Sequence, residues 1–202
     1  MAKRGDRGGA KTRAHIASVA TGMFVERGFD DVTVAEIAAA AGVSKVTVFS
    51  HFDRKEDLAL DRLPDAVSIV RAAVRDRADD VSALEALRGM ALALADEQHP
   101  LSGLSEGAEP LARTVAGSRA LISRLREFEH EIDAELADEL ENDARFSGDS
   151  ELTAALVVAA YRTVVLATVR RRLAGEDLAD LLAAHRQRLD SAFAALSAAL
   201  PG

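Results

Sequence analysis

The sequence predicts an all-α protein of about nine helices, and two observations support this fold class. Ala, Leu, Arg, Asp and Glu dominate the 202 residues, whereas aromatic residues make up only 4% and β-branched residues rarely cluster. This balance favours helix over strand. Apolar residues also recur every third or fourth position along most of the chain, which is the period of a helix with one buried face.

The first segment combines an arm with one helix. Residues 1–10 are basic and rich in glycine, and we expect a flexible arm there. From Lys11 onward, apolar residues are spaced for one face of a helix. Gly28 fits the C-terminal cap of that helix, because glycine readily adopts the left-handed backbone that such caps need.

Two short helices joined by a glycine turn are predicted over residues 33–52. Thr33 and Glu36 form a Thr-x-x-Glu capping box at the start of the first helix. Gly42 supplies the positive φ of a tight turn, and Ser44 caps a second helix of only about two turns. A short second helix after such a turn is typical of the helix-turn-helix, which places that helix in the major groove of DNA.

A fourth helix and a helical body over residues 61–202 follow. Asp53 is expected to cap the fourth helix, and Pro64 to interrupt it, because proline lacks a backbone donor. Serine caps then open two longer helices in the middle of the chain. The last two helices are an apolar one around residues 152–169 and one after the Gly175 turn, whose apolar stripe repeats at helical spacing.

The net charge of −8 is divided unequally between the two ends of the chain. Residues 1–62 hold ten Lys or Arg and nine Asp or Glu, which is a balance of +1. Residues 63–202 hold fifteen against twenty-four, which is a balance of −9. An acidic body repels a phosphate backbone, so the N-terminal end is the part expected to meet DNA.

Composition and motifs also exclude several classes of function. The chain has no cysteine, so disulfides and thiol nucleophiles are excluded, and a reducing cytoplasm is the expected location. Residues 1–10 lack the apolar stretch of a secretory signal. The apolar run at 152–169 carries Arg162, and a helix buried on all sides is favoured over a membrane span. Glu127 and His130 have the spacing of a dimetal motif but no second pair, so no metal, cofactor or enzyme activity is expected.

One pattern without gaps runs from about residue 11 to about residue 60. Its residues are Thr12, Arg13, Ile16, Phe24, Glu26 to Phe29, Thr33 to Ala38, Ala41 to Ser44, Thr47, Phe49, His51, Phe52 and Lys55 to Leu58. This pattern resembles the N-terminal domain of the TetR family of transcriptional regulators. The resemblance implies a DNA-binding domain over residues 11–60 and a dimerising, ligand-sensing body over residues 61–202. It also implies a homodimer on a (pseudo)palindromic double-stranded DNA operator, acting as a repressor that a small-molecule effector releases.

The resemblance further implies a set of DNA contacts. Thr33 and Lys55 would bind phosphates at helix starts, while Phe49 and His51 would lie against the DNA backbone. Phe49 stands where the family usually has Tyr and therefore offers only apolar contact. Val46 stands where relatives often have Gly, and its side chain could meet a thymine methyl group. The predicted DNA-binding residues are Thr33, Ser44, Lys45, Val46, Thr47, Phe49, Ser50, His51 and Lys55.

The basic arm has two open interpretations. It resembles the arms of family members that enter an adjacent minor groove, as homeodomain arms do. The alternative is a solvated tail. The candidate arm contacts are Arg4, Arg7, Lys11 and Arg13.

The last two helices are the predicted dimer interface. The first is apolar almost all round, so it needs the domain core on one side and a partner subunit on the other. The stripe of the second suits a four-helix bundle across a two-fold axis, and the alternative is that it only closes its own core. The predicted interface residues are Leu156, Val164, Leu178, Leu182, Leu189 and Phe193.

A sensing pocket is expected among the middle helices. A buried Arg162 would need an anionic partner, either a ligand carboxylate or an internal acid. The alternative for each candidate is a place in the plain core, and no residue identifies the ligand. The candidate lining residues are Met90, Leu94, Leu125, Phe128, Tyr161 and Arg162.

Two other functions stay open. A non-specific architectural DNA-binding protein would lose affinity for all sequences equally when Lys45 is replaced by Ala. A helical metal or cofactor enzyme would retain a stoichiometric metal on purification.

Overall fold

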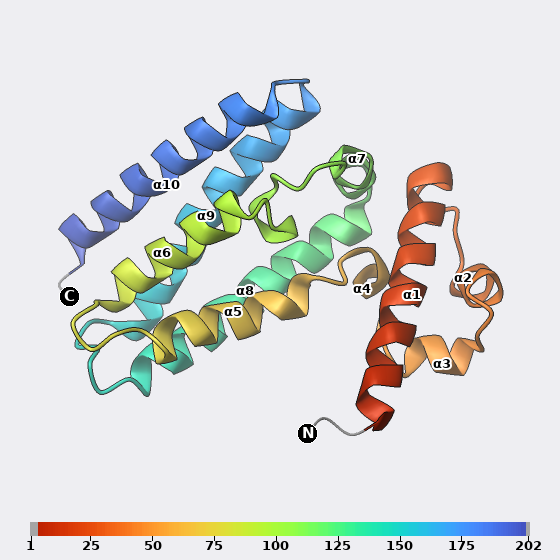
Figure 1. Cartoon of the computed structure of the whole chain (residues 1–202), viewed down its shortest axis with the longest axis horizontal. Coiled ribbons are helices and arrows are strands. Elements are labelled where there is room, and N and C mark those ends of the chain that lie inside the picture. Colours follow the sequence, from red (N-terminus) through yellow and green to blue (C-terminus); the bar gives the residue numbers. More distant parts are fainter. Residues whose placement is uncertain (1–3, 201–202) are drawn as a thin grey trace. The chain divides into compact units, whose positions relative to one another are not determined.

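The computed structural model describes residues 4–200, and side chains are described from residue 9 onward. Within this part the chain forms ten α-helices, one short 3-10 helix and no strand (Figure 1). The all-α prediction is confirmed, with one helix more than expected. The helices are α1 (Arg4–Arg27), α2 (Val34–Ala40), α3 (Lys45–Phe49), α4 (Glu56–Ala59), α5 (Leu63–Arg75), α6 (Ala83–Asp96), η1 (Pro100–Ser102), α7 (Glu109–Gly117), α8 (Arg119–Glu141), α9 (Ser150–Leu173) and α10 (Leu178–Ala199).

Two compact units make up the chain. Unit 1 contains the described residues up to Asp61 together with Pro110–Leu125. Unit 2 contains Arg62–Glu109 and the described residues from Arg126 onward. Unit 1 is therefore larger than the predicted DNA-binding domain over residues 11–60 (the head), because a segment from the middle of the chain packs with it.

Unit 1 has its own core on the apolar face of α1. Ile16 and Phe24 are fully buried and pack with Ile37 of α2, Phe52 after α3 and Leu121 of α8. α2 lies beside α1, and α3 lies beside α2 (Figure 1). The apolar spacing expected from Lys11 onward is thus the spacing of a core face.

The turns of unit 1 follow the sequence signals, but the start of α1 does not. Gly28 has φ 88° and Gly42 has φ 67°, the left-handed region that favours glycine. α1 begins at Arg4, so residues 4–10 are helical and not the flexible arm that was expected. Extending a helix that has already nucleated adds one hydrogen bond for each residue fixed, which lets α1 continue into this glycine-rich segment. Residues 1–3 of the predicted arm lie outside the described part.

The segment after α3 also differs from the prediction at its cap. α4 begins at Glu56 without a side-chain cap, so the cap expected from Asp53 is wrong. Asp57 Oδ2 instead accepts a hydrogen bond from Arg54 N at 3.2 Å. Pro64 lies in the first turn of α5, where its missing N–H removes no helical hydrogen bond.

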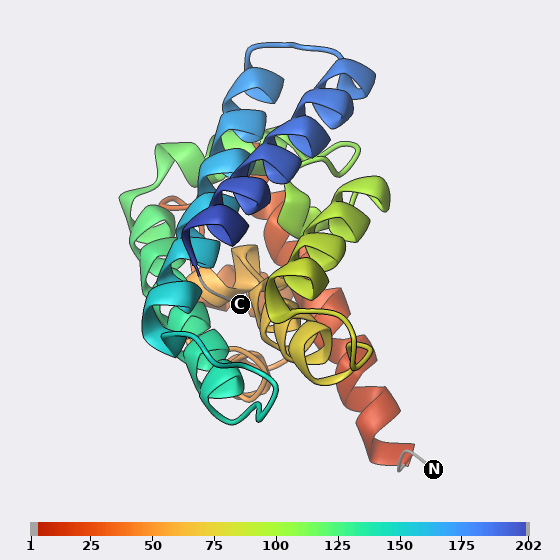
Figure 2. The same ribbon diagram turned by 90° about the vertical axis from the view of Figure 1, so that its left-hand side faces the viewer.

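Unit 2 packs α6, α9 and α10 around its main core. α10 contacts both α9 and α6, and α5 contacts α6. α9 and α10 run side by side (Figures 1 and 2). Leu189 and Phe193 of α10 pack with Leu87 of α6 and Leu136 of α8. The apolar stripe of the last helix therefore faces inward within its own chain.

α9 was predicted to be buried on all sides, but in the structure it is buried on one side. Val157 and Val164 lie in the core of unit 2. The other side of the helix is exposed at Leu152, Leu156 and Leu166. Within residues 4–200, α9 is the helix long and apolar enough to cross a membrane, yet its buried side packs as a core helix does.

Candidate nucleic-acid interface

A complete capping box fixes the start of α2, as predicted. Glu36 N donates to Thr33 Oγ1 at 3.2 Å, and Thr33 N donates to Glu36 Oε2 at 2.8 Å. The Thr33 hydroxyl also donates to Glu36 Oε2 at 2.7 Å, so the hydroxyl proton is already used in a hydrogen bond within the capping box. Arg27 Nη2 donates to the other carboxylate oxygen at 2.7 Å. The hydrogen bonds from Thr33, followed by those from Arg27, lower the pKa of Glu36 to about 2.

Hydrogen bonds within α3 engage the hydroxyl groups predicted to contact DNA. Thr47 N donates to Ser44 Oγ at 3.0 Å, which confirms Ser44 as the cap. The hydroxyls of Ser44 and Thr47 lie 2.9 Å apart and share a hydrogen bond. Ser50 Oγ donates to the carbonyl of Thr47 at 2.8 Å. A contact from these hydroxyls to DNA must therefore use their remaining hydrogen-bonding capacity.

The outer surface of α3 combines a cation with two apolar side chains. Val48 and Phe52 are buried and hold the helix on the core of unit 1. Lys45 is exposed, Val46 is 78% exposed and Phe49 is 48% exposed. Val46 and Phe49 are three residues apart and share a face of the helix. Such a face can contact sugars and thymine methyl groups in a major groove.

Lys55 does not direct its ammonium group toward solvent, so the structure does not show the phosphate site predicted there. Lys55 Nζ donates to the backbone oxygen of Phe29 at 2.5 Å. It also lies 4.2 Å from the centroid of the Phe29 ring and 5.8 Å from that of Phe24. The negative faces of the rings attract the cation, which competes with any phosphate for it.

Arg13, one of the candidate arm contacts, likewise binds inside unit 1. Its guanidinium lies 4.1 Å from the centroid of the Phe52 ring and donates to the backbone oxygen of His51. The side chain of His51 is half-buried, and Lys11 is exposed. The side chains of the other two candidate arm residues, Arg4 and Arg7, lie outside the described part.

The predicted pocket residues are divided between the two units, and two of them have hydrogen-bond partners within the chain. Arg162 is exposed, not buried, and Nη1 donates to Glu129 Oε2 at 2.9 Å. Its partner is thus an internal acid, one of the two predicted alternatives. The Tyr161 hydroxyl donates to the backbone oxygen of Leu101 at 3.2 Å, and burial raises the pKa of this phenol. The other candidates are buried or partly buried residues, Met90, Leu94 and Phe128 in unit 2 and Leu125 in unit 1.

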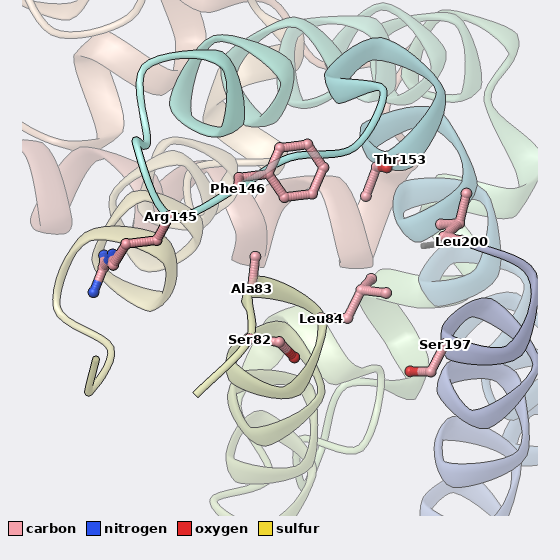
Figure 3. Close-up of a pocket in the computed structure, with 8 residues that line it drawn as sticks. All are labelled: Ser82, Ala83, Leu84, Arg145, Phe146, Thr153, Ser197 and Leu200. Carbon is pink, nitrogen blue, oxygen red and sulfur yellow. The ribbon is translucent and has the colours of Figure 1, made fainter. Parts of the chain in front are cut away.

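A separate cavity of about 110 Å³ lies in unit 2 at the ends of α6, α9 and α10 (Figure 3). Its charged lining residue, Arg145, already donates to the backbone oxygens of Val74 at 3.3 Å and Arg77 at 3.1 Å. Pockets for drug-sized ligands are about 300–1,000 Å³, so this cavity is too small for one. None of the predicted pocket residues lines it. The lining residues are Ser82, Ala83, Leu84, Arg145, Phe146, Thr153, Ser197 and Leu200.

The predicted dimer residues divide into buried and exposed groups. Val164, Leu189 and Phe193 lie in the core of unit 2, so they cannot reach a partner, and their assignment to the interface is wrong. Leu178 and Leu182 pack partly against a smaller core of the same unit. The stripe of α10 closes the core of its own chain, which was the alternative interpretation. Of the predicted interface residues, Leu156 is the exposed one.

Sequence reasoning missed three polar residues inside unit 2. Thr168 and Arg172 of α9 and His185 of α10 are all buried. Thr168 Oγ1 and His185 Nδ1 lie 2.8 Å apart. The position of His185 within the stripe of α10 signals its burial, but no pattern in the sequence signals that the three residues lie together.

The geometry of unit 1 defines the class of this protein. Two short helices meet at a glycine turn, and the second stands on a buried core with its outer face free, which is a helix-turn-helix of the DNA-binding kind. Residues 16–61 match the family described as bacterial regulatory proteins, tetR family. The N-terminal part of the chain is therefore a DNA-binding domain of the TetR type.

Curated relatives match the chain in its N-terminal part. The HTH-type transcriptional regulator AcrR of Shigella flexneri is 38% identical over 58 residues, which cover 29% of this chain and 27% of AcrR. The HTH-type transcriptional repressor KstR2 of Mycobacterium tuberculosis is 33% identical over 82 residues, which cover 40% of this chain and 41% of KstR2. The matches thus span less than half the length of these relatives.

Solved structures resemble the fold over nearly the whole chain. A putative TetR-family regulator from Mesorhizobium loti has a TM-score of 0.59 at 20% identity and is covered completely, as is this chain. NalD, the secondary repressor of the MexAB-OprM multidrug efflux pump in Pseudomonas aeruginosa, has a TM-score of 0.58 at 16% identity, over 93% of this chain and 96% of NalD. SmeT in complex with triclosan has a TM-score of 0.61 at 20% identity, over 92% and 91%. At these identities the likeness concerns the fold.

Proposed function

We propose that the chain is a sequence-specific repressor of transcription in the cytoplasm. A homodimer binds a (pseudo)palindromic operator and leaves it when a small-molecule effector binds the helical body. The observation that carries this proposal is the free outer face of α3, where Lys45, Val46 and Phe49 are exposed above a buried support.

The chemistry of this face suits base reading. Lys45 can donate to a phosphate or to a guanine edge, and its charge adds to affinity in a salt-dependent way. Val46 and Phe49 have no polar group to offer, so they discriminate by contact with thymine methyl groups and by excluding other bases. The burial of Val48 and Phe52 fixes the helix, so the outer side chains enter the groove in a set orientation.

The exposed side of α9 supports the dimer. Leu152, Leu156 and Leu166 lie along one side of the helix, and the exposed Thr163 between them donates its hydroxyl to the carbonyl of Ala159 at 2.7 Å. That side is therefore apolar, and its hydroxyl already has a partner in the same helix. Contiguous apolar patches of this kind mark association sites in soluble proteins. A two-fold axis would pair this side of α9 with its copy.

Repression and effector release rest on the relatives and on the body. KstR2 and NalD are both named repressors, and SmeT is a complex with the small molecule triclosan. An effector would act by binding one conformation of the dimer more tightly than the other, which shifts the population away from the DNA-binding state. Among the described side chains, residues 9–200, no three His, Asp or Glu are placed to hold a metal.

The test selects genomic fragments that the purified protein binds and then measures affinity for the selected sequence and for random DNA at physiological salt. We expect a preference of at least about a thousandfold. Lys45→Ala should weaken binding, and Val46→Ala should change the selected sequence. Val25→Ala is the matched control, because Val25 is an exposed valine on α1 and not on α3.

Equal affinity for selected and random DNA would contradict the proposal. In that case Lys45→Ala would weaken binding to every sequence alike, and the architectural function would stand instead.

A further inference from the structure

The inner side of α9 carries a row of polar side chains through the core of unit 2. Tyr161, Thr168 and Arg172 are seven and then four residues apart, so they lie on one side of the helix. Thr168 of this row faces α10, where His185 hydrogen-bonds to it at 2.8 Å. His185 is 1% exposed and Arg172 is 8% exposed.

The bond between Thr168 and His185 determines where the imidazole carries its proton. Among the described residues, the Thr168 hydroxyl has no side-chain hydrogen bond other than the one to His185 Nδ1. We infer that the hydroxyl is the donor to Nδ1, because its proton has no other acceptor among the described residues, and this leaves the proton of a neutral ring on Nε2. Burial, followed by the charge of Arg188, lowers the pKa of His185 to about 4, so the ring is neutral at physiological pH.

Two buried donors of this region have no hydrogen-bond partner among the described residues. They are Nε2 of His185 and Nη1 of Arg172. Such groups are rare in folded proteins, because burial removes water from a donor without replacing its hydrogen bond. Arg172 lies one turn beyond Thr168, the hydrogen-bond partner of His185, so one acceptor placed between the two groups could serve both.

The surroundings define the chemistry of that acceptor. Arg172 Nε donates to Glu109 Oε1 at 2.7 Å, so the guanidinium charge already has a counter-ion. Leu181, one turn before His185, packs with Ala95 and Leu104. A second negative charge here would lie beside Glu109 in apolar surroundings, which disfavours an anion. A neutral oxygen has no such penalty.

We propose that His185 and Arg172 donate hydrogen bonds to the carbonyl oxygen of a small, mainly apolar effector that is uncharged. This proposal rests on the proposed function, because it identifies the chemical class of the effector. A ketone, ester or lactone has the required acceptor, and its hydrocarbon part would lie against the leucines of α10 and Leu104.

The test titrates the full chain, labelled with ¹⁵N in its histidine and arginine side chains, with 2-octanone. We expect the nuclear magnetic resonance signals of His185 Nε2 and the Arg172 guanidinium to shift together to saturation. 1-Octene, which has the same chain length and no oxygen, should bind at least about tenfold more weakly. Equal binding of the two, or no shift with 2-octanone, would overturn the proposal. Tighter binding of octanoate would overturn the neutral class.

Variants separate these donors from general packing. His185→Phe and Arg172→Met should each weaken 2-octanone binding about tenfold, whereas His185→Gln keeps an N–H donor and should retain most of the affinity. Tyr161→Phe is the matched control on the same side of α9, because its hydroxyl already donates to Leu101. If His185→Phe does not fold, Arg172→Met and His185→Gln carry the comparison. Wild-type affinity in Arg172→Met would overturn the proposal.

Operator binding is measured on the same samples. If the chain binds its operator but does not bind 2-octanone, the proposed effector class is wrong and the proposed function is not affected. A chain that binds 2-octanone through His185 and Arg172 but prefers no DNA sequence refutes the proposed repressor alone.

Discussion

At the residue scale, two lysines of the head have opposite surroundings. Lys45 is exposed on α3, whereas Lys55 donates to Phe29 and lies over two aromatic rings. Lys55→Met keeps most of the apolar stem and removes the ammonium. We expect it to lower the free energy of unfolding by about 1–2 kcal/mol. Lys45→Met, the control, should change it by less than about 0.5 kcal/mol. Urea denaturation measures both.

DNA binding by the same two variants gives the complementary result. Lys45→Met should make the slope of log affinity against log salt concentration less steep by about one, which is the contribution of one phosphate contact. Lys55→Met should leave that slope unchanged. If Lys55→Met is as stable as the wild type and reduces the slope, the ammonium leaves the rings to bind a phosphate. The role implied by the family resemblance would then be correct.

Val46 and Phe49 carry a second prediction at this scale. Once an operator is known, replacing a contacted thymine by uracil removes one methyl group from the DNA and nothing else. We expect affinity to fall about fourfold, which corresponds to about 0.8 kcal/mol for one buried methyl. For the double variant Val46→Ala, Phe49→Ala the same base change should have no effect. An undiminished effect in that variant would show that other residues contact the methyl group.

At the element scale, the sequence predicted what depends on neighbours a few residues apart. The capping box of Thr33 and Glu36, the Ser44 cap and the Gly28 and Gly42 turns were all recognisable, because each signal lies within one turn of its element. The buried stripe of α10 was equally visible. Its partner was not, because periodicity shows that a face is buried and not which surface covers it.

The same limit explains why the partners of two basic residues in the head were not predicted. Lys55 and Phe29 are 26 residues apart, and Arg13 and His51 are 38 apart, so no local pattern connects them. A lysine or arginine in a DNA-binding motif suggests a phosphate contact until the aromatic rings beside it are known. Tertiary packing decides between the two.

The exposed side of α9 carries the prediction at this scale. Leu166 is 43% exposed in the single chain, so Leu166→Glu leaves the core intact. Across a two-fold axis the change would place two carboxylates in the interface and remove two leucines, each worth about 1.5–3 kcal/mol on full burial. We expect association to weaken at least about a hundredfold in sedimentation equilibrium, with unchanged circular dichroism.

Val25→Glu is the control for this experiment, because Val25 is similarly exposed at 41% but lies on α1. It should leave the association constant unchanged. A Leu166→Glu variant that stays dimeric would place the interface on a different surface, such as the outer side of α10.

At the scale of the whole molecule, the division of charge limits how the chain can meet DNA. Residues 63–202 carry a charge of −9 and residues 1–62 a charge of +1, which sum to the net charge of −8. The electrostatic attraction to DNA must therefore come from the head. One head offers few cations, and its affinity alone would be low at physiological salt. We therefore expect a regulator built this way to depend on joining two heads.

This dependence gives the last prediction. Five base pairs inserted between the half-sites rotate one of them by about half a turn of the duplex, which repeats every 10–10.5 base pairs. A dimer then keeps one head in its groove, and affinity measured by electrophoretic shift should fall at least about a hundredfold. Leu166→Glu should bind the original operator as weakly as the wild type binds the interrupted one, and the insertion should not weaken it further. If the insertion affects the variant and the wild type alike, the two heads are not joined through α9, whatever holds them together.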